Sequence, residues 1–149
     1  MVTNVDTGDL TLGVIGTGAM GRGIAQIMAA GGLKVLMFDA TEGAAEAGRA
    51  FAERMIMRAA EKGTLTDDDA EAAAGRLSVV DSLSDLASCN VVVEAVVEDL
   101  SIKRKVFGDL EGIVGEETIL ATNTSSLSVT AIAAELAHPQ RMAGFHFFN

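Results

Sequence analysis

The sequence has little of several residue types that mark particular protein classes. Its 149 residues include one cysteine, Cys89, one proline and no tryptophan or tyrosine. A single cysteine excludes a disulfide scaffold and suits a reducing compartment, so we expect a cytoplasmic protein. The scarcity of proline, together with 49% hydrophobic residues, excludes a disordered tail and a collagen-like repeat. The composition therefore predicts one compact globular domain.

Basic residues and long apolar runs are also scarce. The chain has 11 Lys and Arg against 21 Asp and Glu, which gives a net charge of −10. This acidic balance disfavours sequence-independent binding to nucleic acid and a basic membrane-surface helix. The longest uncharged stretch, residues 118–134, is interrupted by Thr, Asn and Ser and predicts no membrane span. Because the first basic residue is Arg22, we also expect no secretory or transit peptide.

Apolar runs of strand length alternate with longer helical patterns, which is typical of a parallel sheet with crossover helices. Strands are expected at residues 10–15, 34–38, 77–80, 90–97, 118–121 and 142–147. Helices are expected at residues 20–30, 42–62, 99–114 and 128–136, with a further one after Thr66. The acidic residues 67–71 indicate a helix start rather than a metal site, and we expect no metal. The prediction is an α/β fold, a doubly wound, mostly parallel Rossmann-type sheet in three layers, with residues 1–149 as one domain.

A glycine-rich segment lies between the first predicted strand and the first predicted helix. It has the pattern G-x-G-x-x-G and consists of Gly16, Thr17, Gly18, Ala19, Met20 and Gly21. Glycines at these positions permit a tight turn, close approach of the backbone to a pyrophosphate, and close helix packing. The helix start supplies free N–H groups and the positive end of its dipole. The segment predicts a dinucleotide site; the alternative is a tight strand-to-helix turn without a ligand.

Asp39 follows the second predicted strand and stands 23 residues after Gly16, close to the spacing of about 20 expected for a ribose-binding carboxylate. Its oxygens would accept hydrogen bonds from the adenosine ribose hydroxyls. A 2′-phosphate would meet a like charge, and no Lys or Arg lies between Asp39 and Gly48 to neutralise it. We therefore predict NAD rather than NADP. The alternative is that Asp39 caps the next helix.

Ligands of open doubly wound sheets collect at the carboxyl ends of the strands. The polar residues expected there, besides the glycine segment and Asp39, are Glu98, residues 122–126, His146 and Asn149. Ser125 could hydrogen-bond a reacting oxygen, or it could cap the helix that begins near Ser128.

His146 is the candidate for acid–base chemistry among these residues. Its unperturbed pKa of about 6.5 suits a general base that takes the proton of a substrate hydroxyl. The alternative is a neutral core histidine satisfied by a hydrogen bond. Lys103 belongs to the only basic triplet, Lys103-Arg104-Lys105, which is either a solvated helix face or lies near the cleft that binds an anion.

Four segments resemble the NAD-dependent L-3-hydroxyacyl-CoA dehydrogenases, a family that includes bacterial 3-hydroxybutyryl-CoA dehydrogenases. The segments span nearly the whole chain and are residues 14–25, 92–98, 122–127 and 141–149. The resemblance implies reversible oxidation of an (S)-3-hydroxyacyl-CoA to the 3-oxoacyl-CoA and a role in fatty acid metabolism such as β-oxidation. With the composition, it leaves an acyl-CoA substrate as the expected partner, with no nucleic acid and no membrane.

The resemblance also implies roles for single residues. His146 would be the general acid/base, Ser125 would contact cofactor and substrate, and Asn149 would face the nicotinamide. NAD would be held by the glycine segment and Asp39, with further contacts from Glu98, Lys103, Asn123, Ser125 and Asn149. Lys62 is similar to the family position that meets the CoA phosphate.

In this family the histidine is paired with a glutamate a short way downstream, and a helical carboxy-terminal domain closes the cleft, binds part of the acyl group and forms a homodimer. We therefore expect this chain to be the cofactor domain of a longer enzyme, with little or no turnover alone. Two alternatives remain open at this point. One is a sugar-acid dehydrogenase of the gulonate type, and the other is a non-catalytic NAD-binding module.

Overall fold

The computed structural model describes residues 6–148 and contains a six-stranded sheet in which all five neighbouring strand pairs are parallel. The strands are β1 (Thr11–Ile15), β2 (Lys34–Phe38), β3 (Leu77–Val79), β4 (Val91–Glu94), β5 (Ile119–Thr122) and β6 (Met142–Gly144). Their order in the sheet is β3-β2-β1-β4-β5-β6. This is the strand order of a doubly wound dinucleotide-binding fold, so the predicted fold class is confirmed.

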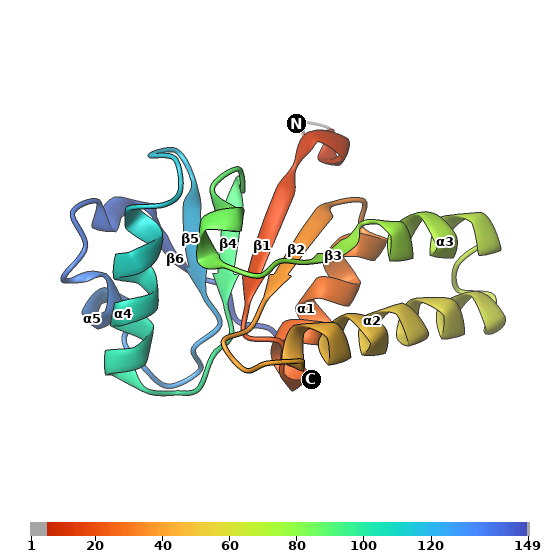
Figure 1. The fold of residues 1–149 in the computed structure, drawn as a ribbon, viewed down its shortest axis with the longest axis horizontal. Coiled ribbons are helices and arrows are strands. Elements are labelled where there is room, and N and C mark those ends of the chain that lie inside the picture. Colours follow the sequence, from red (N-terminus) through yellow and green to blue (C-terminus); the bar gives the residue numbers. More distant parts are fainter. Residues whose placement is uncertain (1–5, 149) are drawn as a thin grey trace.

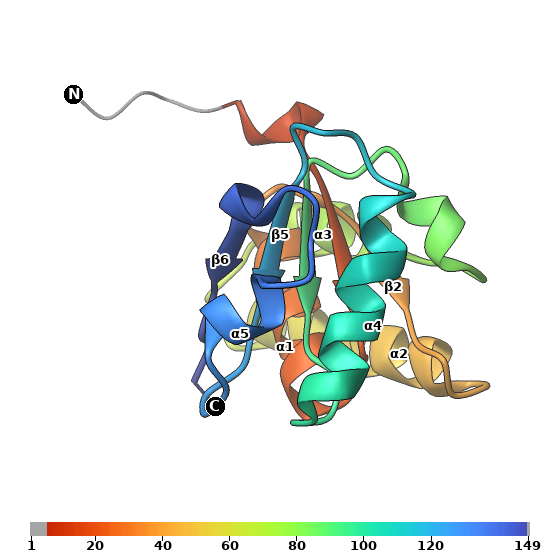
Figure 2. The same cartoon turned by 90° about the vertical axis from the view of Figure 1, so that its left-hand side faces the viewer.

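Helices cover both faces of the sheet, which gives three layers (Figures 1 and 2). The helices are α1 (Ala19–Ala30), α2 (Ala44–Glu61), α3 (Asp67–Gly75), α4 (Leu100–Glu111) and α5 (Val129–Ala133). One core cluster joins β1 and β2 to α1, α2 and α3, and a second joins the other face to α4 and α5. Short 3-10 turns lie at Thr7–Asp9, Leu83–Leu86 and Pro139–Arg141.

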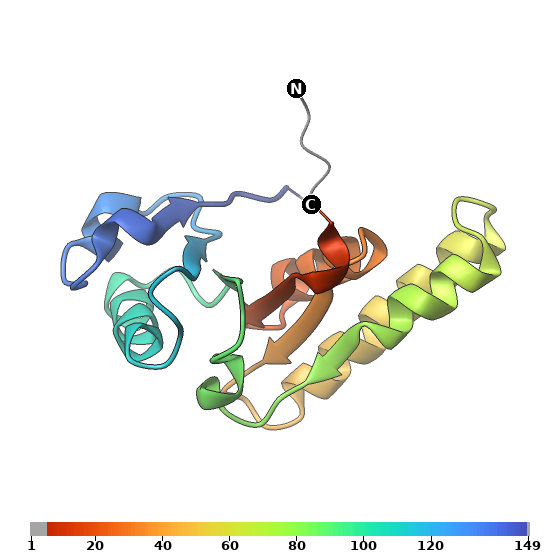
Figure 3. The same cartoon turned by 90° about the horizontal axis from the view of Figure 1, so that it is seen from above.

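Helices α2 and α3 form an antiparallel pair that projects beyond the sheet (Figure 3). The Thr66 hydroxyl accepts the N–H of Asp69 at 3.1 Å, and three aspartates occupy the first turn of α3. Such residues stabilise the positive end of a helix, so the acidic cluster is the helix start that the sequence predicts. Among the helices of residues 6–148, none is both long and apolar enough to cross a membrane.

Two strands end three residues earlier than predicted. β4 ends at Glu94 instead of residue 97, because the Glu94 side chain turns back and accepts the N–H of Val96 at 2.8 Å. β6 ends at Gly144 instead of residue 147, because its neighbour β5 ends at Thr122, whose carbonyl accepts the N–H of Phe145. Helices α4 and α5 each end three residues earlier than predicted, at Glu111 and Ala133.

Candidate functional site

The glycine segment connects β1 to α1 at the carboxyl edge of the sheet. Gly16 has φ +86°, and a Cβ atom there would lie 2.6 Å from the Ala95 carbonyl oxygen. A Cβ on Gly21 would lie 1.7 Å from the Gly16 oxygen, so α1 packs against the turn only without a side chain. Gly18 differs, because a Cβ there would meet no atom within 4 Å. The geometry of the turn explains why positions 16 and 21 require glycine. It does not explain the glycine at the exposed position 18.

The start of α1 offers free backbone donors. Gly18 is the N-cap of α1, and no side chain caps this helix. The following residues, Ala19 and Met20, form its first turn and carry no charge of their own. A helix of 12 residues with an uncapped, partly exposed start fits a bound pyrophosphate.

Asp39 contacts the glycine segment directly. Its Oδ2 atom accepts the backbone N–H of Thr17 at 2.8 Å and the Thr17 hydroxyl at 2.9 Å, and its Oδ1 accepts the N–H of Thr41 at 2.9 Å. Burial alone would raise the pKa of Asp39, but the hydrogen bonds from Thr17 and Thr41 hold it below its ordinary value. Asp39 is not a helix cap, because α2 begins after the N-cap Gly43, so that alternative is wrong.

A cavity of about 590 Å³ opens beside Asp39 and Gly18. Its walls are mostly apolar and come from the ends of β1 and β2, the loop after β4, and α4. They include Ile15, Phe38, Val96, Val97, Ile102 and Val106. A planar aromatic base fits such walls, and the Asp39 carboxylate at the rim would face its sugar.

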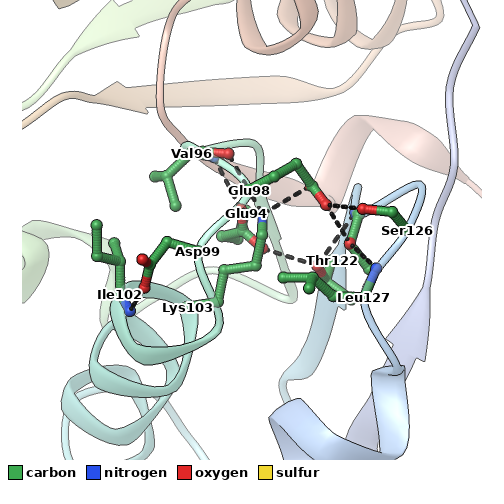
Figure 4. Close-up of polar contacts among 10 residues, drawn as sticks. Glu94, Val96, Glu98, Asp99, Ile102, Lys103, Thr122, Ser126 and Leu127 are labelled. Carbon is green, nitrogen blue, oxygen red and sulfur yellow. Dashed lines mark hydrogen bonds and ion pairs between the residues drawn. The ribbon is translucent and has the colours of Figure 1, made fainter.

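A buried polar network lies under the neighbouring part of the edge, between β4, β5 and α4 (Figure 4). Glu94 and Lys103 are both 0% exposed, and the Lys103 Nζ donates to Glu94 Oε2 at 2.5 Å. Glu94 Oε1 accepts the Thr122 hydroxyl at 2.7 Å. Lys103 also donates to the Val96 carbonyl at 3.3 Å and pairs with Glu98 Oε1 at 3.3 Å. Both charges of this buried pair therefore have hydrogen-bonding partners, as charged groups removed from water require.

Glu98 joins the loops that follow β4 and β5. Its Oε2 accepts the Thr124 hydroxyl at 2.7 Å and the Ser126 hydroxyl at 3.0 Å. Burial raises the pKa of Glu98, but these two hydroxyls and the Lys103 charge hold it below the ordinary value. Ser125 lies between the two donors and is exposed. Ser125 does not cap α5, because Ser128 does so by accepting the N–H of Ala131, and that alternative is wrong.

His146 lies on the segment after β6, not within a strand, and its side chain is exposed. The alternative of a buried core histidine is therefore wrong. Asn123 accepts the N–H of Phe147 at 2.9 Å, which fastens this segment to the loop after β5. Phe147 packs against the core cluster that contains α1. His146 and Ser125 thus lie on two connected segments at the carboxyl edge, while Asn149 lies outside the described residues.

The three cations of the basic triplet lie in different surroundings. Lys103 is buried, so a solvated helix face is wrong for it, and its contact with a cofactor stays a prediction. Arg104 donates to the Ala131 carbonyl at 2.9 Å, and exposed Lys105 pairs with Asp109 at 2.8 Å. Lys62 is exposed at the end of α2, whose 18 residues place it about 27 Å along the helix from its start.

Some of the polar residues that build this site are not predicted by any motif. Glu94 is the one charge inside the apolar run 91–97, and such a charge signals a buried partner, which is Lys103. Gly48 allows α2 to approach Thr17, since a Cβ there would lie 2.9 Å from the Thr17 Cβ. Among residues 6–148, no group of three or more His, Cys, Asp or Glu is placed to hold a metal ion.

Comparison with known proteins identifies relatives over nearly the whole chain. Residues 11–149 match the family described as "3-hydroxyacyl-CoA dehydrogenase, NAD binding domain". The chain is 39% identical over 139 residues to a 3-hydroxybutyryl-CoA dehydrogenase of Mycobacterium tuberculosis, covering 93% of this chain and 49% of that protein. It is 39% identical over 136 residues to a fatty acid oxidation complex subunit alpha of Pseudomonas entomophila, covering 91% of this chain and 19% of that protein.

A solved structure has the same fold. The crystal structure of 3-hydroxybutyryl-CoA dehydrogenase from Escherichia coli K12 superposes with a TM-score of 0.91 and 39% identity, covering 94% of this chain and 30% of that chain. The chain spans about half the length of several curated relatives that it matches.

Proposed function

Because the chain belongs to the family of 3-hydroxyacyl-CoA dehydrogenase NAD-binding domains, we propose that it is the cofactor half of an enzyme that oxidises (S)-3-hydroxyacyl-CoA to 3-oxoacyl-CoA. The family supports NAD as the cofactor. The observation that carries the proposal is the exposed, uncapped start of α1 at Gly18, next to the Asp39 carboxylate and the apolar cavity. This arrangement fits a dinucleotide without a 2′-phosphate.

The residues divide into a cofactor group and a reacting group. Gly16 to Gly21 would hold the pyrophosphate, and Asp39 the adenosine ribose. When bound, NAD supplies the hydride acceptor. An imidazole nitrogen of His146 takes the proton of the 3-hydroxyl and returns it in the reverse reaction, which contributes about 10²–10⁴-fold to the rate. Ser125 donates a hydrogen bond to the reacting oxygen.

We also propose that the natural protein is longer, works in the cytoplasm and forms a homodimer through a further helical domain. The length of the relatives supports the first point, since they have about twice as many residues. The single, unpaired Cys89 suits a reducing compartment. Lys62, at the outer end of α2, is the proposed contact for the CoA phosphate, and the relative from a fatty acid oxidation complex favours β-oxidation as the setting.

Titration of this chain with NADH and NADPH, followed by nicotinamide fluorescence, tests the cofactor assignment. We expect NADH to bind more tightly, and tighter binding of NADPH would overturn the role of Asp39. A protein extended to the relatives' length should oxidise NADH when acetoacetyl-CoA is added. NADH binding without such turnover would favour a binding module, and turnover only with a 3-oxo sugar acid would favour a gulonate-type enzyme.

A further inference from the structure

Both carboxylate oxygens of Glu94 are occupied by groups from different elements. Oε1 accepts the Thr122 hydroxyl at the end of β5, and Oε2 accepts the Val96 N–H in the loop after β4 and the Lys103 ammonium of α4. With 0% exposure, Glu94 cannot touch a ligand in the site above it. It can act only through the groups that it holds.

The groups held by Glu94 lead to the reacting side of the site (Figure 4). Lys103 pairs with Glu98, and Glu98 accepts the hydroxyls of Thr124 and Ser126, which flank Ser125. A second route runs through Thr122, whose Oγ1 atom accepts the N–H of Thr124 at 3.2 Å. Both routes end on the loop that carries Ser125.

The stability of the fold does not account for this pair. Removing two charges from water costs several kcal/mol per ion, and apolar pairs of similar size often serve the core as well or better. The surrounding core is apolar, with Phe107 and Leu120 fully buried in the cluster on this face. A charged pair in such surroundings is best explained by what it orients.

We propose that Glu94 is a positioning residue that acts through Lys103 and Thr122 to hold the Ser125 loop against the nicotinamide half of the cofactor. The inference rests on the proposed function, since it assigns the loop to the nicotinamide side. The adenosine half depends on Gly18, Asp39 and the apolar cavity instead. The two halves of the cofactor site are therefore separable by substitution.

The experiment compares wild type, Glu94→Gln, Lys103→Met and the double variant, using thermal unfolding, the affinities for NADH and ADP, and the nicotinamide emission spectrum. Each single variant leaves a buried group without its partner, so both should melt at lower temperature. The double variant has a neutral pair and should recover most of the melting temperature. It should still bind NADH about tenfold more weakly, with an altered emission spectrum, while its ADP affinity is retained.

A purely structural pair gives a different result. If the double variant recovers stability and also binds NADH as wild type does, the positioning role is overturned. Because Lys103 is itself a predicted cofactor contact, Thr122→Val decides whether or not the double variant folds: it keeps the ion pair and removes only the connection from Glu94 through Thr122 to Thr124. Thr122→Val should bind NADH severalfold more weakly and ADP as tightly as wild type. If this variant binds NADH with wild-type affinity, the proposal is overturned.

Two further arms complete the design. Glu53→Gln breaks the exposed Arg49–Glu53 pair on α2, remote from the network, and should leave every readout unchanged. Failure of the wild-type chain to bind either nucleotide would overturn the proposed function itself, and this inference with it. Binding by wild type with no selective loss in the variants would overturn only the inference.

Discussion

Thr17 and Asp39 are joined by two hydrogen bonds to one carboxylate oxygen, at 2.8 Å from the Thr17 nitrogen and 2.9 Å from its hydroxyl. They connect the turn after β1 to the end of β2, although 22 residues separate the two. The backbone N–H of Thr17 is therefore committed to Asp39, and the donors left for a pyrophosphate are those that begin α1. The same bonds fix the position of the carboxylate that we propose selects NAD over NADP.

Gly18→Ala should weaken NADH binding by roughly tenfold or more without lowering the melting temperature. The added Cβ meets no protein atom within 4 Å, so only a bound cofactor can clash with it. Gly108→Ala, at an exposed position of α4, also has open space and is the matched control, with unchanged binding. Gly21→Ala should instead unfold or strongly destabilise the chain, since its Cβ would overlap the Gly16 oxygen. Full NADH affinity in Gly18→Ala would refute the pyrophosphate site.

Asp39→Asn should reduce the preference for NADH over NADPH by about tenfold, because it removes the charge that repels a 2′-phosphate. The amide oxygen can still accept the N–H groups of Thr17 or Thr41, so the turn is kept. Competition between the two nucleotides, read by fluorescence, measures the ratio of their dissociation constants. A ratio unchanged from wild type would place the ribose elsewhere.

His146→Gln should lower turnover of the full-length protein with acetoacetyl-CoA by about 10²–10⁴-fold while NADH affinity is retained. His146 is exposed, so the fold should not change. His138→Gln is the control, because His138 lies before β6 at the opposite edge of the sheet and should be silent in the same assay. Equal loss in both variants would contradict an acid/base role for His146.

Glu98 should stabilise the fold at neutral pH and lose this effect in acid. Its pKa in the folded protein is below the ordinary 4.5, so the folded state favours the charged carboxylate. Such a contribution is complete above the unfolded pKa and disappears as pH falls through the folded one. Urea unfolding of wild type and Glu98→Gln should therefore show a difference in free energy that shrinks below pH 4.5. A difference that does not change with acidification would speak against the hydrogen bonds of Thr124 and Ser126.

Cys89 should react with thiol reagents only after unfolding. The side chain is 3% exposed, and burial raises the pKa of its thiol to about 11 although the positive charge of Lys34 opposes the shift. Because the fold disfavours the thiolate, stability should fall as pH rises above the ordinary value of 9.0, and less so in Cys89→Ser. Rapid labelling of the native chain at neutral pH would show that the second core cluster opens readily.

The sequence predicts the sheet and the glycine turn well because both depend on local patterns. The run 10–15 is apolar, and Gly16, Gly18 and Gly21 follow it at once, so strand, turn and helix start are visible in neighbouring residues. The ends of β4 and β6 are not visible in this way. β4 ends where the Glu94 side chain turns back to the Val96 N–H, and β6 ends where its neighbour β5 ends. Both ends are set by tertiary contacts.

The candidate site shows the same division. Asp39 and His146 stand where motif spacing and strand order predict them, at the carboxyl edge. The basic triplet predicts that Lys103 lies on the surface or near the cleft, whereas the structure buries it. The residues next to Lys103 in the sequence give no sign of this burial. Its partner Glu94 comes from a different element, nine residues earlier, and only packing of α4 on β4 brings the two charges together.

β6 is an edge strand in the described sheet, with Ala143 and Gly144 exposed and hydrogen bonds to β5 on one side. The outward N–H and C=O groups of such a strand can pair with any extended chain that arrives in register. Here the edge is only three residues long, and of its three residues Ala143 has a small side chain and Gly144 has none. So short an edge leaves few backbone groups free, which limits pairing between β6 and the strands of other molecules.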